Sequence, residues 1–178
     1  RIFTLTKISL MKFIDEARVR AAGGDGGPGK ISWRREKFVP LGGPDGGDGG
    51  SGGAVIFVTD PGLNTLIDFA FSPQLNAESG APGDANQRHG RDGADCVCRV
   101  PVGTQVYRGE ELVADLSSPN SCWIAARGGR GGKGNAYFKA PTNQAPDFAQ
   151  PGRAGEIHEL RLVLKSVADA GLVGLPNT

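Results

Sequence analysis

The sequence of residues 42–53 is GGPDGGDGGSGG, and two shorter stretches, residues 23–29 (GGDGGPG) and 128–134 (GGRGGKG), have the same character. Together the three stretches hold 18 of the chain's 29 glycines in 26 residues. Within each stretch glycines recur every third residue, and the same spacing returns at 80 and 83, 90 and 93, and 152 and 155. A flexible linker has no reason to keep such a period.

Three residues per turn is the repeat of the left-handed polyproline II helix, which has no internal hydrogen bonds and must pair its backbone elsewhere. Because ordering glycine is entropically costly, such an array is stable only if the bare backbones approach and bond to one another. We predict a packed bundle of polyproline II segments with two glycine faces per turn. The third position is expected to point outward, and it holds Asp25, Pro28, Asp45, Asp48, Ser51, Arg130 and Lys133.

Composition excludes several other classes of protein. Proline, at 12 of 178 residues, is too rare for collagen. A hydrophobic content of 38% and a net charge of +1 do not fit a disordered chain. The longest apolar runs, such as residues 54–58, reach five residues, far short of the roughly 18 that cross a bilayer. We therefore expect a folded domain without a membrane span.

Between the glycine stretches, short segments rich in Val, Ile and aromatic residues alternate with turn signals. The predicted strands are Phe13 to Arg20, Ile31 to Phe38, Ala54 to Thr59, Asp95 to Val100, Thr104 to Tyr107, Glu111 to Leu116, Ser121 to Arg127 and Ile157 to Lys165. Helical signal is sparse, and Leu63 to Phe71 is the best candidate for a turn or two of helix. Alternation is clearest in residues 157–164, where His158, Leu160, Leu162 and Leu164 form one mostly apolar face. This pattern predicts an all-β body.

The chain offers no catalytic constellation. Cys96, Cys98 and Cys122, with only His89 and His158 to assist, lack the spacing of a disulfide framework or a zinc site. We expect reduced cysteines, no bound metal, a surface or hydrogen-bonding role for His89 and a structural role for His158. Matches to GxGxxG and GxSxG among the glycines lack the preceding strand, the following helix or both, which dinucleotide sites and nucleophile elbows require.

Local charge is more informative than net charge. Residues 127–139 carry four cations and no acidic residue, and residues 30–37 carry four cations against Glu36 alone. Aromatic residues, Trp33, Phe38, Tyr137 and Phe138, are interleaved, a combination that suits RNA phosphates and exposed bases. Solvated charges above β-core aromatics explain the same pattern. The candidate RNA contacts are Lys30, Arg34, Arg35, Lys37, Arg88, Arg91, Arg130 and Lys133.

The two ends of the chain differ from the middle. Met11 is the only methionine, so we expect it to be the native start and residues 1–10 to be extraneous. Near the other end, a predicted buried strand at 168–173 leads into Gly174, Leu175, Pro176, Asn177 and Thr178, which match the first five positions of a Walker A phosphate loop. The expected division is one domain over residues 11–167 and the truncated start of a second over 168–178.

Eight stretches follow one another along the chain: MKFIDEARV (11–19), WRREKFVPLGGPDGGDGGSGG (33–53), LNTLIDF (63–69), RHGRDG (88–93), VPVGT (100–104), ARGGRGGKGN (126–135), PTNQAP (141–146) and ADAGLVGLPN (168–177). In them the chain resembles the amino-terminal domain of the Obg family of GTPases, also called CgtA. Departures are modest: Trp33 stands where phenylalanine is commoner, and Thr178 where the family usually has alanine.

The resemblance implies an Obg fold, in which a β-barrel base carries a projecting glycine-rich bundle of polyproline-type helices, followed by a Ras-like α/β GTP-binding domain. It implies a cytoplasmic, monomeric protein that binds the large ribosomal subunit and its RNA, not DNA, during assembly and the stringent response. The projecting loops would lie near the peptidyl-transferase region, with tips near Pro28 to Arg35, Gly83 to Arg91 and Arg130 to Phe138. GTP and Mg²⁺, and guanosine tetraphosphate as a further candidate ligand, would belong to the full-length protein, because residues 1–178 lack the phosphate-loop lysine and the switch regions.

A purely structural polyproline II bundle, which binds ice or a protein partner through a flat face, is the alternative from another functional class. Such a face is poor in charge, whereas the outward positions here include Asp, Arg and Lys.

Overall fold

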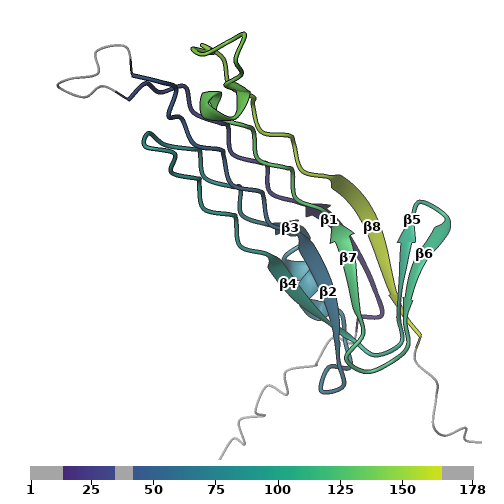
Figure 1. The fold of residues 1–178 in the computed structure, drawn as a ribbon. Coiled ribbons are helices and arrows are strands. Elements are labelled where there is room, and N and C mark those ends of the chain that lie inside the picture. Colours follow the sequence, from purple (N-terminus) through teal and green to yellow (C-terminus); the bar gives the residue numbers. More distant parts are fainter. Residues whose placement is uncertain (1–13, 35–41, 166–178) are drawn as a thin grey trace, which may run out of the picture.

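The computed structural model describes residues 14–34 and 42–165 (Figure 1). Strands form one end of the molecule, which we call the base, and glycine-rich segments project from it as a prong (Figure 1). The all-β prediction is confirmed, since the only α-helix in the described part of the chain is α1. The elements are β1 (Glu16–Ala22), β2 (Val55–Asp60), α1 (Ile67–Phe71), β3 (Gln74–Asn76), β4 (Cys96–Pro101), β5 (Thr104–Arg108), β6 (Glu111–Leu116), β7 (Cys122–Ala126), the 3₁₀ turn η1 (Asn135–Phe138) and β8 (Ile157–Leu164).

The base consists of two sheets, one of five strands in the order β3-β1-β8-β5-β6 and one of three in the order β4-β2-β7. The predicted β-barrel base is not confirmed, because the described strands do not form a closed barrel. Closure requires every strand to pair on both sides, yet β3 and β6 each have one partner, as do β4 and β7. The two sheets instead meet through the side chains of their inner faces, and α1 contacts β1.

Alternation along the strands places the core between the sheets. On β8, Leu160, Leu162 and Leu164 are buried, as the sequence alternation predicts. Phe57 of β2 is fully buried, with its ring stacked on Trp123 at 6.2 Å between centroids and edge-on to Phe69 at 6.1 Å. Aromatic burial of this kind ties the smaller sheet to α1 and stabilises the base.

The structure differs from the predicted elements at two places. The strand expected over Ile31 to Phe38 is absent from its described part, residues 31–34, where Trp33 forms only an isolated bridge with Pro44; residues 35–38 lie outside the described residues. The three-residue strand β3 was missed, because its pairing partner β1 lies some fifty residues away and sets its conformation.

No helix among the described residues is long and apolar enough to cross a membrane.

The prong consists of six extended segments, residues 23–30, 46–53, 78–84, 88–95, 127–134 and 150–156, joined by backbone hydrogen bonds. The bonds repeat every third residue: Gly24 N donates to Gly53 O at 2.9 Å, and Gly27 N donates to Gly50 O at 2.8 Å. The acceptor number falls as the donor number rises, so these two segments run antiparallel. The period of three in the sequence is therefore the period of the hydrogen-bond pattern.

Glycine density differs between the segments with the most neighbours and those with the fewest. The central segments 23–30 and 46–53 each bond to four others and carry two glycines in three residues, whereas 88–95 and 150–156 bond to two others and carry one in three. A Cβ on Gly52 would overlap the carbonyl group of Gly24. None of these glycines has a positive φ, which in the described chain occurs at glycine only at Gly103 and Gly109. Close approach of backbones, and not left-handed geometry, therefore requires glycine in the prong.

Candidate nucleic-acid interface

A groove of about 460 Å³ lies between the outer prong segments 127–134 and 150–156. Its lining contains three cationic side chains, one aromatic ring and no acidic residue: Arg130, Gly131, Lys133, Tyr137, Gln150, Pro151, Gly152 and Arg153. We call it the prong groove.

Backbone pairing brings the two arginines together. Arg153 N donates to Arg130 O at 2.9 Å, and one repeat further along Gln150 N donates to Lys133 O at 2.8 Å. Arg130 and Arg153 are both exposed, and neither forms an ion pair with any described residue. Both arginines line the prong groove, and two cationic side chains without a counter-charge there favour an anionic ligand.

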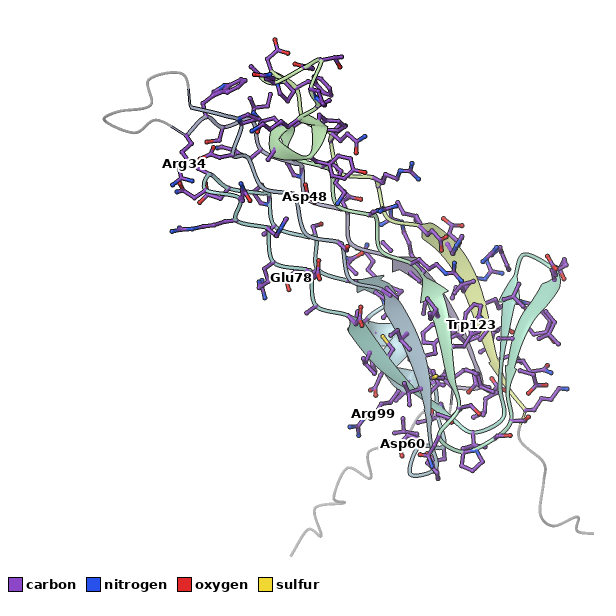
Figure 2. All side chains as sticks on the ribbon, in the orientation of Figure 1. Arg34, Asp48, Asp60, Glu78, Arg99 and Trp123 are labelled. Atoms are coloured by element: carbon purple, nitrogen blue, oxygen red, sulfur yellow. The ribbon has the colours of Figure 1, made fainter. Side chains whose placement is uncertain are left out.

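Lys133 forms an ion pair with Asp48 of the central segment 46–53. Figure 2 labels Asp48 within the prong. The ammonium lies 2.6 Å from Asp48 Oδ2, and Asp48 Oδ1 accepts a hydrogen bond from Gly134 N at 2.8 Å. Partial burial alone would raise the pKa of Asp48, but these hydrogen bonds and the charges of Lys133 and His89 outweigh burial and lower it. His89 accepts a hydrogen bond from Asp48 N at 3.3 Å, which confirms its predicted hydrogen-bonding role.

An aromatic cluster borders the groove. Tyr137 is 65% exposed, and Lys133 Nζ lies 5.1 Å from its ring centroid. Phe138 meets Tyr137 edge-on at 5.3 Å and packs against Phe148 at 4.6 Å. The tyrosine ring is therefore fixed in position although most of its surface is open to solvent.

Asn135 ties the chain together beneath this cluster. Its side chain is fully buried; Oδ1 accepts from Gly46 N at 2.9 Å, and Nδ2 donates to Ser32 O at 3.0 Å and to Pro146 O at 3.1 Å. Backbone groups of three separate stretches thus bond to one side-chain amide, which fixes the 3₁₀ turn η1 against the prong.

With this geometry described, comparison with known proteins is informative. The model of the GTP1/OBG family matches residues 14–166. The chain belongs to the GTP1/OBG family. Proteins named GTPase Obg are similar to it: that of Sorangium cellulosum is 52% identical over 169 residues, that of Syntrophobacter fumaroxidans 56% over 169, and that of Desulfovibrio desulfuricans 54% over 171. Each match covers 94% of this chain but only 47–49% of the relative, so the chain spans about half the length of these proteins.

The GTP1/OBG domain brings together only part of the predicted RNA-contact set. Arg130 and Lys133 share the prong groove. Arg91 pairs with Glu78 on another side of the prong, where Glu78 Oε2 also accepts from Ala94 N at 3.0 Å. That backbone hydrogen bond and the Arg91 charge lower the pKa of Glu78.

The other predicted contacts are spread over the prong or lie outside the description. Lys30 and Arg88 are exposed, and Figure 2 shows Arg34 towards the outer end of the prong. Arg35 and Lys37 lie outside the described residues, as do all five residues of the partial phosphate loop, Gly174 to Thr178.

Asp45 does not point outward as predicted. It is only 4% exposed, because the turn at 85–87 covers it: Gln87 N donates to Asp45 O at 2.6 Å and Asn86 N donates to Oδ2 at 3.3 Å. The period of three predicts an outward side chain at Asp45, but the turn at residues 85–87 packs over this position. A local glycine period carries no information about that turn.

Sequence reasoning missed Arg153 and Gln150. A signal was present, since Gly152 and Gly155 continue the spacing of three and Arg153 stands between them. What the sequence did not show is that this segment lies beside 127–134, so that Arg153 and Arg130 form one pair of charges.

The remaining candidates are structural. His158 Nε2 lies 3.5 Å from Glu156 Oε2, and Glu156 also accepts from Arg127 N at 3.0 Å. The three cysteines are free thiols, and Cys96 Sγ lies 3.7 Å from Cys98 Sγ. Over residues 14–34 and 42–165, no group of three or more His, Cys, Asp or Glu side chains is arranged to hold a metal ion.

Proposed function

We propose that this chain is the amino-terminal, RNA-contacting domain of an Obg-family GTPase and that it acts on the large ribosomal subunit during assembly and in the stringent response. The observation that supports this is the prong groove, in which Arg130 and Arg153 lie side by side next to exposed Tyr137 without an acidic residue. Phosphate contacts from arginine give RNA affinity, and an exposed ring suits an unstacked base.

We propose further that the prong segments are left-handed polyproline II helices. The three-residue hydrogen-bond repeat and the absence of positive φ at the prong glycines support this assignment. Such a bundle is rigid because its central segments bond to four neighbours. A rigid prong carries its contact residues into a confined RNA site at a small entropic cost.

GTP binding and hydrolysis belong, in this proposal, to the part of the full-length protein that begins near residue 168. Gly174 to Thr178 would start its phosphate loop, and Mg²⁺ and guanosine tetraphosphate would bind there or at its junction with this domain. The domain itself would act as a monomer in the cytoplasm.

Removal of two charges from the prong groove tests the proposal. In Arg130→Gln with Arg153→Gln, co-sedimentation with large ribosomal subunits should weaken, and the slope of log affinity against log salt should fall by about 1.4–1.8, the value for two phosphate contacts. Arg18→Gln with Arg108→Gln is the matched control, because both side chains are exposed on the base. Unchanged binding in the groove variant, or equal loss in both, would remove the prong groove from the interface.

The alternative of an ice-binding or protein-binding face makes a different prediction. It requires thermal hysteresis, or capture of a protein partner, without binding to ribosomal subunits. The exposed arginines of the prong groove do not suit a flat face of low charge.

A further inference from the structure

The ring of Tyr137 has a cation over one face, and the side chain is 65% exposed to solvent. Lys133 lies over it at 5.1 Å and is itself fixed by Asp48 at 2.6 Å, while the Phe138 ring packs perpendicular to it, with 5.3 Å between the centroids. Packing of Phe138 on Phe148 completes this support. Because the ring is already ordered, a planar ligand that stacks on it costs little side-chain entropy.

The space beside the ring suits one nucleotide. A groove of about 460 Å³ lies within the range of small-ligand sites. Arg130 and Arg153, paired through their backbones at 2.9 Å, supply cations for a phosphate, and Gln150 adds an amide that is both donor and acceptor. Glycine at 131 and 152 removes side chains from the floor between them.

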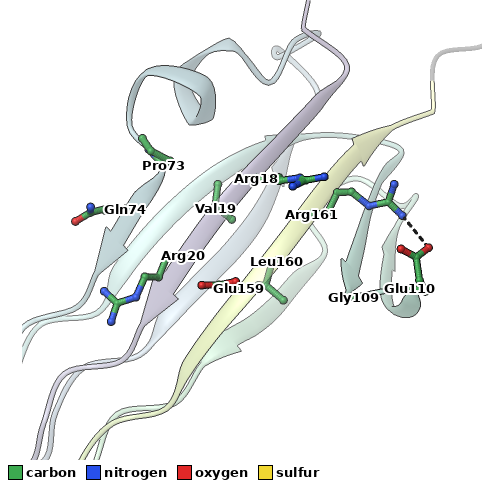
Figure 3. A pocket seen from close by; sticks show the side chains of 10 residues that line it. All are labelled: Arg18, Val19, Arg20, Pro73, Gln74, Gly109, Glu110, Glu159, Leu160 and Arg161. Atoms are coloured by element: carbon green, nitrogen blue, oxygen red, sulfur yellow. Dashed lines mark ion pairs between the residues drawn. The ribbon is translucent and has the colours of Figure 1, made fainter.

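A second groove lies on the outer face of the larger sheet (Figure 3). Unlike the prong groove, it contains carboxylates as well as cations. It is lined by Arg18, Arg20 and Arg161, but also by Glu110 and Glu159. Arg161 already pairs with Glu110 at 3.7 Å and lies over Tyr107 at 4.9 Å. With carboxylates among its cations, this groove does not select phosphate.

We infer that the prong groove binds an unpaired nucleotide of RNA, with the base stacked on Tyr137 and the adjoining phosphate held by Arg130 and Arg153. This inference rests on the proposed function and names the form of RNA that the site takes. In a duplex, bases are stacked on their neighbours and cannot reach a tyrosine ring, so the groove discriminates against paired RNA. Stacking is tolerant of sequence, so any of the four bases is accepted.

The test compares a single-stranded RNA octamer that carries 2-aminopurine with a duplex of the same sequence. The unsubstituted chain should quench 2-aminopurine fluorescence and bind the single strand more tightly. Tyr137→Ala should weaken single-strand binding roughly 5- to 150-fold and abolish quenching, with little change for the duplex. Tyr137→Phe keeps the stacking ring and should retain both. Phe71→Ala, which removes an aromatic ring that is 79% exposed on the base, is the matched control and should bind like the parent.

Failure of the inference differs from failure of the proposed function. If Tyr137→Ala binds both RNAs as the parent does, while Arg130→Gln with Arg153→Gln still weakens ribosomal binding, the stacking site is refuted and the RNA-contacting role stands. Loss of duplex and single-strand binding to the same extent in Tyr137→Ala would also refute it. If the parent binds the octamer but does not sediment with large subunits, the proposed function fails instead.

Discussion

Replacement of Gly52 by alanine is the sharpest test of the prong. The added Cβ would overlap the carbonyl group of Gly24 and lie 2.9 Å from Asp25 O. These are backbone atoms that cannot rotate away, so segment 23–30 must separate from segment 46–53. The hydrogen bonds that join the two segments are Gly24 N to Gly53 O at 2.9 Å, Gly27 N to Gly50 O at 2.8 Å and Lys30 N to Gly47 O at 3.0 Å.

The cost follows from these bonds. Three backbone hydrogen bonds at a net value of about 0.5–1.5 kcal/mol each are weakened or lost. Alanine restricts the unfolded chain and returns about 0.4–1 kcal/mol. We therefore expect Gly52→Ala to lower the free energy of unfolding by about 0.5–4 kcal/mol, compared with the roughly 5–15 kcal/mol of a typical domain.

Urea unfolding followed by tryptophan fluorescence measures this loss. Trp123 reports on the base, through its stacking on Phe57, and Trp33 reports on the prong, through its bridge to Pro44. Amide hydrogen exchange at Gly24 should accelerate about tenfold for every 1.4 kcal/mol lost.

Gly43→Ala is the matched control in the same glycine stretch. A Cβ at Gly43 would meet only Lys139 Nζ, at 3.5 Å, which is ordinary contact with a flexible side chain. This variant should be neutral or slightly stabilised. If Gly52→Ala and Gly43→Ala unfold at the same urea concentration, close backbone approach is not what requires glycine here, and the account of the prong fails.

Three further predictions concern other parts of the domain. Asn135→Ala should lower the free energy of unfolding by about 2–4 kcal/mol, because buried backbone groups lose their hydrogen-bond partners. Asn135→Asp should keep the hydrogen bond that the side-chain oxygen accepts from Gly46 N but lose those that Nδ2 donates. Urea unfolding and amide exchange measure the effect of both variants. The folded-state pKa of Asp48 is lowered, so its ion pair with Lys133 stabilises the fold above the ordinary carboxylate pKa, and this contribution disappears as pH falls through the lowered pKa. The free energy of unfolding, measured from pH 6 to pH 2, should therefore be less sensitive to acid in Asp48→Asn than in the parent. An unchanged pH profile would contradict the assignment. Burial and a neighbouring thiol raise the pKa of Cys98 to about 12, so at pH 8 a thiol reagent should label exposed Cys122 first and Cys98 only on unfolding, as peptide mass spectrometry would show.

Agreement between sequence and structure is closest where structure repeats locally. The glycine period of three predicted the hydrogen-bond period of the prong, and the alternation along β8 predicted its buried leucines. In both cases the neighbour that a residue needs is set by the geometry of its own segment. Prediction failed at β3, whose strand conformation depends on pairing with β1, and at Asp45, which is covered by a distant turn.

The candidate interface divides in the same way. The sequence by itself determined the all-β class, the three-residue repeat of the glycine-rich segments and the local run of basic residues that contains Arg130 and Lys133. Only the tertiary structure decided that Arg153 joins Arg130, that Asp48, 85 residues from Lys133, neutralises that lysine, and that the sheets remain open. Periodicity states which side of a segment is bare or charged, but the partner on that side is chosen by backbone pairing over long sequence separations, which no local pattern encodes.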